Sequence, residues 1–192
     1  MEIKIANRSE YNQVAASLTL SFSMDAVSRW IFPDPYGHMR AFFDWVDVHS
    51  GLAFEHHSAF YVGNFDGVAM CLPPGVTPDE KLGIEHFEKT VPENMKSEVA
   101  RMFEQLPKYR PQEPHYSIQF LGVQPNCQGR GIGPALMKHV LNICDRKKAT
   151  SYLECSDKRN VRLYESLGFK VLAEVSVGNS PAIIPMVRKF PG

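Results

Sequence analysis

Hydrophobic and polar positions follow two different periods along this chain, which predicts an α/β protein. Some segments alternate apolar with polar residues, or form short apolar runs, as strands do. In other segments apolar residues recur every three to four positions, as on one face of a helix. Strands are predicted at residues 2–6, 59–64, 67–72, 116–123, 151–155, 169–177 and 183–189. Helices are predicted from a cap at Asn7 or Ser9 through Phe22, and at 25–31, 37–57, 79–106, 132–144 and 160–167.

Two local patterns add detail to this order. Asp66-Gly67 lies between two predicted strands and is a strong hairpin signal. The helix at 37–57 is expected to bury one apolar stripe, formed by Met39, Phe43, Val46 and Ala53. The whole order predicts a mixed sheet with helices on its faces.

Glycines occupy alternate positions at one strand-to-helix junction, Gly129, Gly131 and Gly133. Backbone N–H groups there are not covered by side chains, and the following helix adds unpaired N–H groups and its positive dipole end. These features predict an anion site, most often for phosphate. Pro134 suits the first helical turn, where a missing N–H group costs nothing. A glycine-rich turn without a ligand is the alternative.

Two common phosphate-binding motifs do not match this junction. The dinucleotide fingerprint needs a third glycine where this chain has Pro134. A Walker A loop needs Gly-Lys followed by Ser or Thr, which this stretch lacks. The anion site therefore belongs to another class of loop.

The stretch Leu121–Gly133 resembles the acyl-CoA loop of the GNAT superfamily of N-acetyltransferases. That family's pattern, Gln/Arg-x-x-Gly-x-Gly/Ala, is met by Gln128, Gly131 and Gly133. The resemblance implies that the loop wraps the pyrophosphate of coenzyme A, and that the preceding strand presents backbone groups to the pantetheine. The cofactor-binding residues that it implies are Leu121, Gly122, Val123, Gln128, Gly129, Arg130, Gly131, Ile132, Gly133, Pro134, Asn160 and Tyr164.

The order of predicted elements is similar to the GNAT order across nearly the whole chain. The resemblance implies a mostly antiparallel central sheet flanked by helices, in a single domain of residues 1–192. A helical insertion at about 73–112, divided near Pro92, is longer than in the minimal form of the family. Such an insertion favours a closed pocket for a small molecule.

A second signal lies about thirty residues after the glycine loop. Asn160 and Tyr164 are four positions apart and are expected to share one helix face. They resemble the GNAT pair that faces coenzyme A, in which the tyrosine is the general acid for the departing thiolate. A phenol suits this role because its pKa of about 10 keeps it protonated at neutral pH. A core tyrosine without a catalytic role is the alternative.

The general base is less clearly marked, because the strand at 116–123 carries no carboxylate. Glu154 is the catalytic candidate, since it lies on the strand beside the cofactor strand. A carboxylate paired with Arg159, or simply solvated, is an equal alternative. Glu113, His115 and a chain of water molecules are further possibilities, and the two side chains are expected to be structural.

Several segments are similar to those of the puromycin N-acetyltransferase-like subgroup: Arg29–Pro35, Leu72–Gly75, His115-Tyr116 and Leu153–Ser156. This resemblance implies a small-molecule amine substrate without naming it. Aromatic side chains near these segments can hold a flat or cationic group. The predicted substrate-binding residues are Trp30, Tyr36, Tyr109 and Tyr116.

Composition narrows the partners and the compartment. The 21 Lys and Arg residues balance 21 Asp and Glu residues, so a uniformly basic surface for nucleic acid is not supported. No apolar run suggests a membrane span, and the N-terminus lacks a signal-peptide core. Four scattered cysteines are expected to be reduced thiols in a cytoplasmic protein. No metal site is expected, because His49, His56 and His57 lack zinc-ligand spacing.

These patterns together predict an enzyme that moves an acetyl group from acetyl-CoA to a primary amine of a small molecule. A backbone N–H group near Val123 would polarise the thioester carbonyl, and Tyr164 would protonate the thiolate. Protein N-terminal or lysine acetylation is one alternative, and a non-catalytic acyl-CoA sensor is another. The chain is expected to be a monomer or a homodimer.

Overall fold

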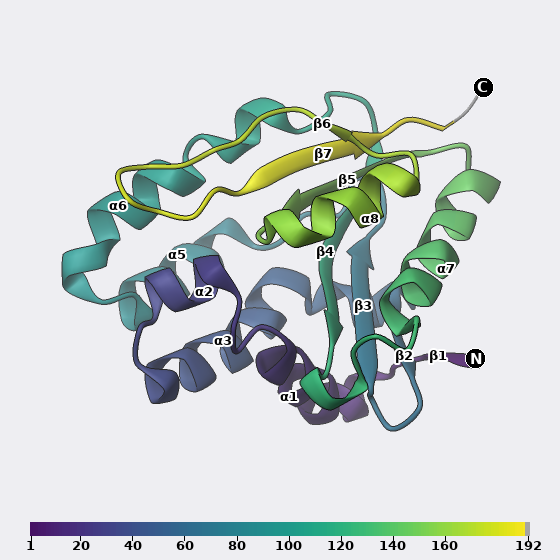
Figure 1. Ribbon diagram of the computed structural model, residues 1–192, viewed down its shortest axis with the longest axis horizontal. Helices are drawn as coiled ribbons and strands as arrows, with labels where there is room; N and C mark the ends of the chain where they lie inside the picture. The colour runs from purple at the N-terminus through teal and green to yellow at the C-terminus, as the bar shows by residue number, and fades with distance from the viewer. Residues whose placement is uncertain (191–192) are drawn as a thin grey trace.

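The computed structural model describes residues 1–190, and its centre is a seven-stranded sheet with helices on both faces (Figure 1). The strands are β1 Ile3–Ile5, β2 Ala59–Val62, β3 Gly67–Leu72, β4 His115–Val123, β5 Thr150–Cys155, β6 Lys170–Val171 and β7 Ile184–Arg188. Their order is β1-β2-β3-β4-β5-β7-β6, and all neighbours are antiparallel except β4 and β5, which are parallel. The predicted fold class, a mixed and mostly antiparallel sheet flanked by helices, is confirmed.

Several helices begin where an aspartate side chain accepts a backbone N–H group. Asp25, Asp34 and Asp79 each cap a helix in this way. The helices are α1 Tyr11–Ser21, α2 Ala26–Ile31, α3 Pro35–Ser50, α4 Leu52–Glu55, α5 Glu80–Thr90, α6 Glu93–Phe103, α7 Ile132–Arg146 and α8 Val161–Ser166. Short 3₁₀ turns lie at Arg8–Glu10, Leu106–Tyr109, Pro125–Cys127 and Lys158–Asn160. The predicted division of 79–106 into two helices at Pro92 is confirmed.

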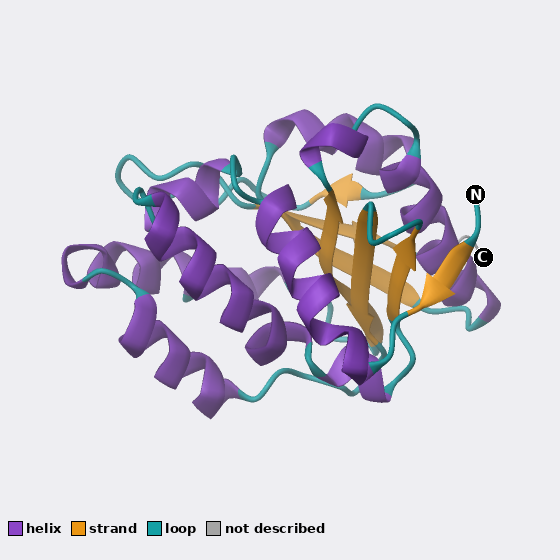
Figure 2. Cartoon of the chain, turned by 90° about the horizontal axis from the view of Figure 1, so that it is seen from below, coloured by secondary structure: helices purple, strands orange, loops and turns teal. Residues whose placement is uncertain are grey.

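The sheet separates two apolar cores. One face packs against α7 through Leu136 and Val140, and the other packs against α1 and α3 through Leu18 and Val46. A third cluster joins α2 and α6 to the segment 175–183. Figure 2 shows helices extending beyond one end of the sheet, where Figure 1 labels α2, α3, α5 and α6. This helical region borders one end of β4 and β5.

A one-residue irregularity in β4 changes which face its side chains occupy. Met70 of β3 pairs with Phe120, but the next residue, Cys71, pairs with Ile118, so Gln119 is an extra residue in β4. Ile118 accordingly packs in the α7-face core, whereas Phe120 packs in the opposite core. An extra residue also bends its strand.

The parallel pairing of β4 and β5 stops where this bulge begins. Residues 115–118 of β4 pair with residues 150–153 of β5, and residues 119–123 have no partner on that side. Figure 1 shows β5 and β7 turned away from the direction of β3 and β4. The two central strands therefore diverge, and the sheet opens between them.

The predicted helix at 37–57 is divided, and one position of its predicted buried stripe is wrong. It is broken at Gly51 into α3 and α4. Val46 and Ala53 are buried as predicted, whereas Met39 is 58% exposed. The buried residues His38, Phe42 and Val46 are four positions apart and share one face, and Met39 lies one position, about 100°, around the helix from His38.

The strand predicted at 169–177 is much shorter than expected. Residues 169–177 pair with β7 only at Lys170–Val171, and one isolated bridge joins Val175 to Ile183. Pro185 would face the next position of this ladder and has no N–H group to donate. The regular pairing between β6 and β7 therefore ends early.

The hairpin between β2 and β3 is confirmed: β3 begins at Gly67 as predicted, and β2 ends at Val62, two residues earlier than predicted. Val62 pairs with Gly67, so the turn is formed by residues 63–66 and Gly67 belongs to β3. A Cβ at Gly67 would lie 2.5 Å from Ile132 Cγ2 and 3.2 Å from Leu136 Cδ1. Glycine is needed here because the first turn of α7 packs directly on this backbone.

We expect Gly67→Ala to destabilise the protein by about 1–3 kcal/mol, the usual cost of overpacking a core. Its methyl group would displace the start of α7. Denaturant unfolding measures this loss. Gly83→Ala in α5 is the control, because a Cβ there meets nothing within 4 Å and alanine favours a helix. Equal stability of Gly67→Ala and the parent would refute the packing argument.

Candidate functional site

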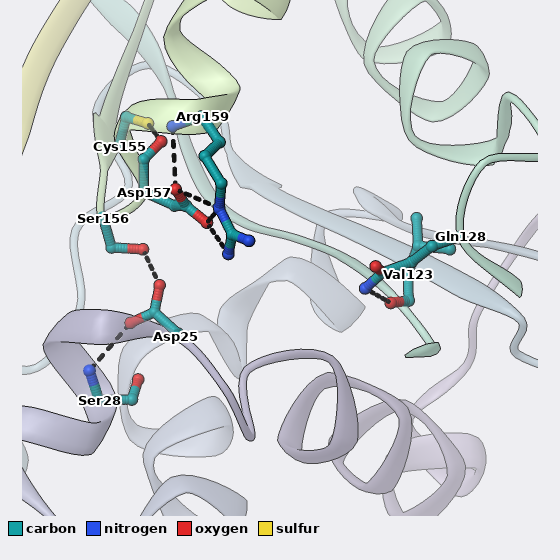
Figure 3. Close-up of polar contacts among 8 residues, drawn as sticks. All are labelled: Asp25, Ser28, Val123, Gln128, Cys155, Ser156, Asp157 and Arg159. Atoms are coloured by element: carbon teal, nitrogen blue, oxygen red, sulfur yellow. Dashed lines mark hydrogen bonds and ion pairs between the residues drawn. The ribbon is translucent and has the colours of Figure 1, made fainter. Parts of the chain in front are cut away.

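The opening between β4 and β5 exposes backbone hydrogen-bonding groups. Residues 119–123 pair with β3 on one edge, while their other edge has no strand partner. One of these groups, the Val123 carbonyl, accepts a hydrogen bond of 3.2 Å from Gln128 Nε2 (Figure 3). Unpaired backbone groups beside a core are a ready template for an extended polar ligand.

The glycine loop lies at the end of β4 and leads into α7. Gly129 and Gly131 have φ angles of 75° and 77°, and Gly131 is the N-cap of α7. A Cβ on either would meet no atom within 4 Å, so the glycines are needed for their backbone angles and they border open space. The N–H groups of Ile132 and Gly133 lie in the first turn, where a helix provides no internal acceptor.

The rest of the loop holds this shape. Arg130 Nη2 donates to the Asn126 carbonyl over 2.9 Å, and a Cβ on Gly133 would lie 3.6 Å from Val123. Pro134 lies in the first turn of α7, as predicted. Open space before free N–H groups at a helix start fits a pyrophosphate. Leu121 and Gly122 lie on the free edge of β4, so the predicted cofactor residues at 121–134 adjoin one another.

Tyr164 lies on α8, against the α7-face core. It is 8% exposed, its ring packs edge-on against Phe169, and its hydroxyl has no hydrogen-bond partner among residues 1–190. Burial raises the pKa of Tyr164 well above its usual range, and nearby Cys155 and Asp157 add to this shift. The phenol is therefore protonated at neutral pH. The predicted helix at 160–167 begins one residue later: Asn160 is the N-cap of α8, has helical backbone angles at the end of a 3₁₀ turn, and is exposed.

Polar side chains follow one face of β5. Leu153 and Cys155 point into the α7-face core, so Tyr152, Glu154 and Ser156 point to the opposite face. Tyr164, in the same core as Leu153, lies on the other side of the sheet from this row.

Glu154, the predicted base, is held by two neighbours. Its Oε1 accepts hydrogen bonds from the Tyr152 hydroxyl at 3.0 Å and from Arg110 Nη2 at 3.4 Å. The alternative in which Glu154 pairs with Arg159 is wrong. Arg159 instead contacts Asp157, with 2.6 Å between Nη2 and Oδ2, and thereby lowers the pKa of that carboxyl.

A second carboxylate, which the sequence did not mark as functional, reaches the end of this row. Asp25 Oδ1 accepts the Ser28 N–H group at 2.9 Å, and its Oδ2 accepts the Ser156 hydroxyl at 2.6 Å (Figure 3). Asp25 is 8% exposed. The sequence signal was only a helix cap, and nothing in it pairs residues that lie 131 positions apart. Ser156 follows the parallel part of β5, so this contact lies at the open end of the strand pair.

The four predicted substrate aromatics lie in different places. Trp30 and Tyr109 pack against the third cluster, beside α2 and α6. Tyr36 is 67% exposed on α3, where it stacks with Arg40. Tyr116 is buried in the α7-face core, on the opposite side of the sheet from the polar row of β5, and its substrate contact stays a prediction.

The histidines near the sheet have local partners. His115 Nδ1 lies 2.9 Å from the Glu113 carbonyl, and its ring contacts Tyr152. His49 stacks on Trp45 and contacts Phe120, and burial lowers its pKa to about 4. Within residues 1–190 no group of His, Cys, Asp and Glu could hold a metal ion, and all four cysteines are free and buried. No helix in that range has the length and hydropathy to cross a membrane.

A mixed sheet opened between β4 and β5, with a glycine loop starting the next helix, defines an acyltransferase of the GNAT type. The model of the acetyltransferase (GNAT) family matches residues 21–169, so the chain belongs to this family and is an acetyltransferase. Acetyltransferases of this family use acetyl-CoA. The family-level resemblance of the sequence is confirmed, while the puromycin N-acetyltransferase-like subgroup stays a prediction.

Known relatives agree with this assignment. An uncharacterized N-acetyltransferase of Schizosaccharomyces pombe is 26% identical over 197 aligned residues, covering 88% of this chain and 74% of that protein. A structure described as histone acetyltransferase HPA2 and related acetyltransferase, from Corynebacterium glutamicum, has a TM-score of 0.70 at 21% identity, covering 99% and 96% of the two chains. Arylalkylamine N-acetyltransferase 2 from Aedes aegypti has a TM-score of 0.69 at 14% identity and covers 99% of each chain. At these identities the two structures establish the fold alone.

We expect Gly131→Val to weaken acetyl-CoA binding at least about tenfold, since lost hydrogen bonds to a charged group cost about 1.5–3 kcal/mol each. Its side chain would cover the N–H groups at the start of α7. Calorimetric titration measures the affinity. Gly75→Val is the control, because Gly75 also has a positive φ and open space but lies outside the loop. Both variants should lose similar stability, and unchanged affinity in folded Gly131→Val would exclude the loop from the cofactor site.

Proposed function

We propose that this enzyme transfers the acetyl group of acetyl-CoA to a primary amine of a small molecule by direct attack. The observation that carries the proposal is the open junction of β4 and β5, with a protonated tyrosine on one face and carboxylates on the other. Acid and base on opposite faces suit a carbonyl between them, because the amine arrives on one side while the thiolate departs from the other.

The loop and the free edge of β4 are proposed to hold acetyl-CoA, which supplies an acetyl group activated as a thioester. The N–H groups of residues 129–133 would bind the pyrophosphate, and the backbone of residues 121–123 would bind the pantetheine. Asn160 would contact the cofactor from the turn before α8. A free N–H group near Val123 would stabilise negative charge on the carbonyl oxygen.

We assign the proton acceptor to Asp25, acting through Ser156. The hydroxyl of Ser156 already donates to Asp25, so its oxygen is oriented to accept a proton from the ammonium form of the substrate. Asp25 would take the serine proton in the same transfer. Glu154 remains the alternative base, but its Oε1 is engaged by both Tyr152 and Arg110.

Tyr164 is the proposed general acid. Its raised pKa keeps the phenol protonated, and its hydroxyl is not committed to another described residue. In the complete reaction the amine nitrogen bonds to the acetyl carbon and the carbon–sulfur bond breaks. The first proton of the ammonium goes through Ser156 to Asp25 before attack, and the sulfur receives the proton of Tyr164. The second proton leaves the nitrogen as the intermediate collapses and passes through solvent to reprotonate Tyr164. The products are an N-acetyl amide and coenzyme A.

Two other functions are tested by the same assay. The histone acetyltransferase in the description of one similar structure supports protein acetylation, whereas arylalkylamine and agmatine N-acetyltransferases support small amines. The insertion carrying α5 and α6 favours a small substrate. Coenzyme A release with amines, with peptides and with neither separates these functions from a non-catalytic acyl-CoA sensor. The proposed enzyme is cytoplasmic, and is a monomer or a homodimer.

Tyr164→Phe should lower kcat at least about tenfold, since general acid catalysis typically contributes about a hundred- to ten-thousandfold and water can substitute in part. The ring and its packing on Phe169 remain, so acetyl-CoA affinity and melting temperature should change little. Tyr61→Phe, which removes a hydroxyl on β2, is the control and should keep the parental kcat. A Tyr164→Phe enzyme that turns over like the parent would end the general-acid assignment.

Asp25→Asn should lower kcat/KM by about a hundredfold or more while preserving the fold, because asparagine caps helices as well as aspartate does. Ser156→Ala should cause a smaller loss, since water can replace the serine. Rate profiles against pH and melting temperatures for both variants, with Glu154→Gln beside them, identify the base. A large fall in kcat for Glu154→Gln with a near-normal Asp25→Asn enzyme would return the role to Glu154.

A further inference from the structure

One cation beside the polar row of β5 has few partners. Arg110 follows the 3₁₀ turn Leu106–Tyr109 and reaches β5 from the insertion. Its side chain is 45% exposed, and its guanidinium donates from Nη2 to Glu154 and also lies within hydrogen-bonding reach of the Tyr152 hydroxyl. Since a guanidinium has five N–H donors, most of its capacity is unused.

The geometry of this ion pair is loose compared with another in the same protein. Arg188 donates to both oxygens of Asp145 at 2.6 and 2.9 Å, and its side chain is 13% exposed. Arg110 contacts one oxygen of Glu154 at 3.4 Å, longer than the roughly 2.7–2.9 Å of a strong charge-assisted bond. The Arg188 guanidinium is engaged in a structural ion pair, whereas the Arg110 guanidinium can still form a bidentate contact with another carboxylate.

Tyr152, His49 and His115 lie near this pair. The Tyr152 hydroxyl donates to the same oxygen of Glu154, and burial raises the pKa of Tyr152, so it remains neutral at pH 7. His49 also lies near Arg110, and its low pKa keeps it uncharged at pH 7. His115 packs on the far side of Tyr152. Arg110 is therefore a cation that a ligand meets on this face of β5, with the carboxylates of Glu154 and Asp25 beside it.

We propose that Arg110 binds a carboxylate of the substrate, so the acetylated amines are amino acids or closely similar amino carboxylates. This inference rests on the proposed function, in which the amine faces Ser156 and Asp25. Glu154 and Ser156 are two residues apart on one strand face, roughly 7 Å along the strand. A short amino carboxylate can span that distance with its amine at Ser156 and its carboxylate at Arg110. Glu154 holds the arginine in place.

Matched substrates test this inference in the coenzyme A release assay. The sets are phenylalanine, phenylalaninamide and phenethylamine, and leucine, leucinamide and isopentylamine. We expect the amino acid of each set to have the highest kcat/KM. Arg110→Gln should lower kcat/KM for the amino acids at least about tenfold, mainly through KM, and leave the amides and amines nearly unchanged. Arg110→Lys should restore part of the loss, because it keeps the charge without the bidentate fork.

Arg101→Gln is the control variant, since Arg101 is an exposed residue of α6 in the same insertion, and it should behave like the parent. The inference is overturned if the enzyme uses all members of a set equally, or if Arg110→Gln lowers kcat/KM equally for all of them. The Arg110–Glu154 pair would then have a structural role. Calorimetric titration of phenylalanine into the coenzyme A-loaded protein separates this outcome from failure of the proposed function. If phenylalanine binds in a way that depends on Arg110 but is not acetylated, the recognition site is supported and the proposed catalysis is refuted. If phenylalanine neither binds nor is acetylated, the recognition site is refuted.

Discussion

The extra residue Gln119 in β4 controls the geometry of the whole junction. By inserting one residue opposite the β3 ladder, it sends Ile118 into one core and Phe120 into the other. The pairing of β4 with β5 ends at the same point. A regular parallel ladder would consume the hydrogen-bonding groups of residues 119–123. The bulge leaves them free at the centre of the molecule, where α7 and the N-terminal helices already exclude water from both faces.

The glycine loop depends on the same packing. The first turn of α7 lies so close to β3 that Gly67 cannot carry a side chain without contacting Ile132. This contact sets where α7 begins, and therefore where its unpaired N–H groups point. Gly131 then caps α7 with a positive φ, which lets the chain turn into the helix while leaving the space before it open. A residue in the β2–β3 hairpin thus helps to position the anion site.

Local patterns in the sequence were enough to predict the sheet, the divided insertion and the glycine loop, because each depends on residues that are neighbours in the chain. They did not predict the contact of Asp25 with Ser156 or of Arg110 with Glu154, which join residues 131 and 44 positions apart. The face of the sheet that Tyr116 occupies was not predicted either, because the bulge at Gln119, which reverses the faces of β4, has no clear sequence signal. Glu154 was selected for its strand position, and its two hydrogen-bond donors became visible only with the tertiary structure.

The side-chain periodicity of β5 explains why the proposed acid and base do not neutralise each other. Successive residues of a strand point to opposite faces, so Cys155 borders Tyr164 while Ser156 reaches Asp25. The apolar face keeps the phenol protonated by excluding water. The polar face supplies charged groups that are each held by a hydrogen bond from a different segment. A single short strand therefore presents two environments to one carbonyl, and the opening made by the β4 bulge gives a substrate access to both.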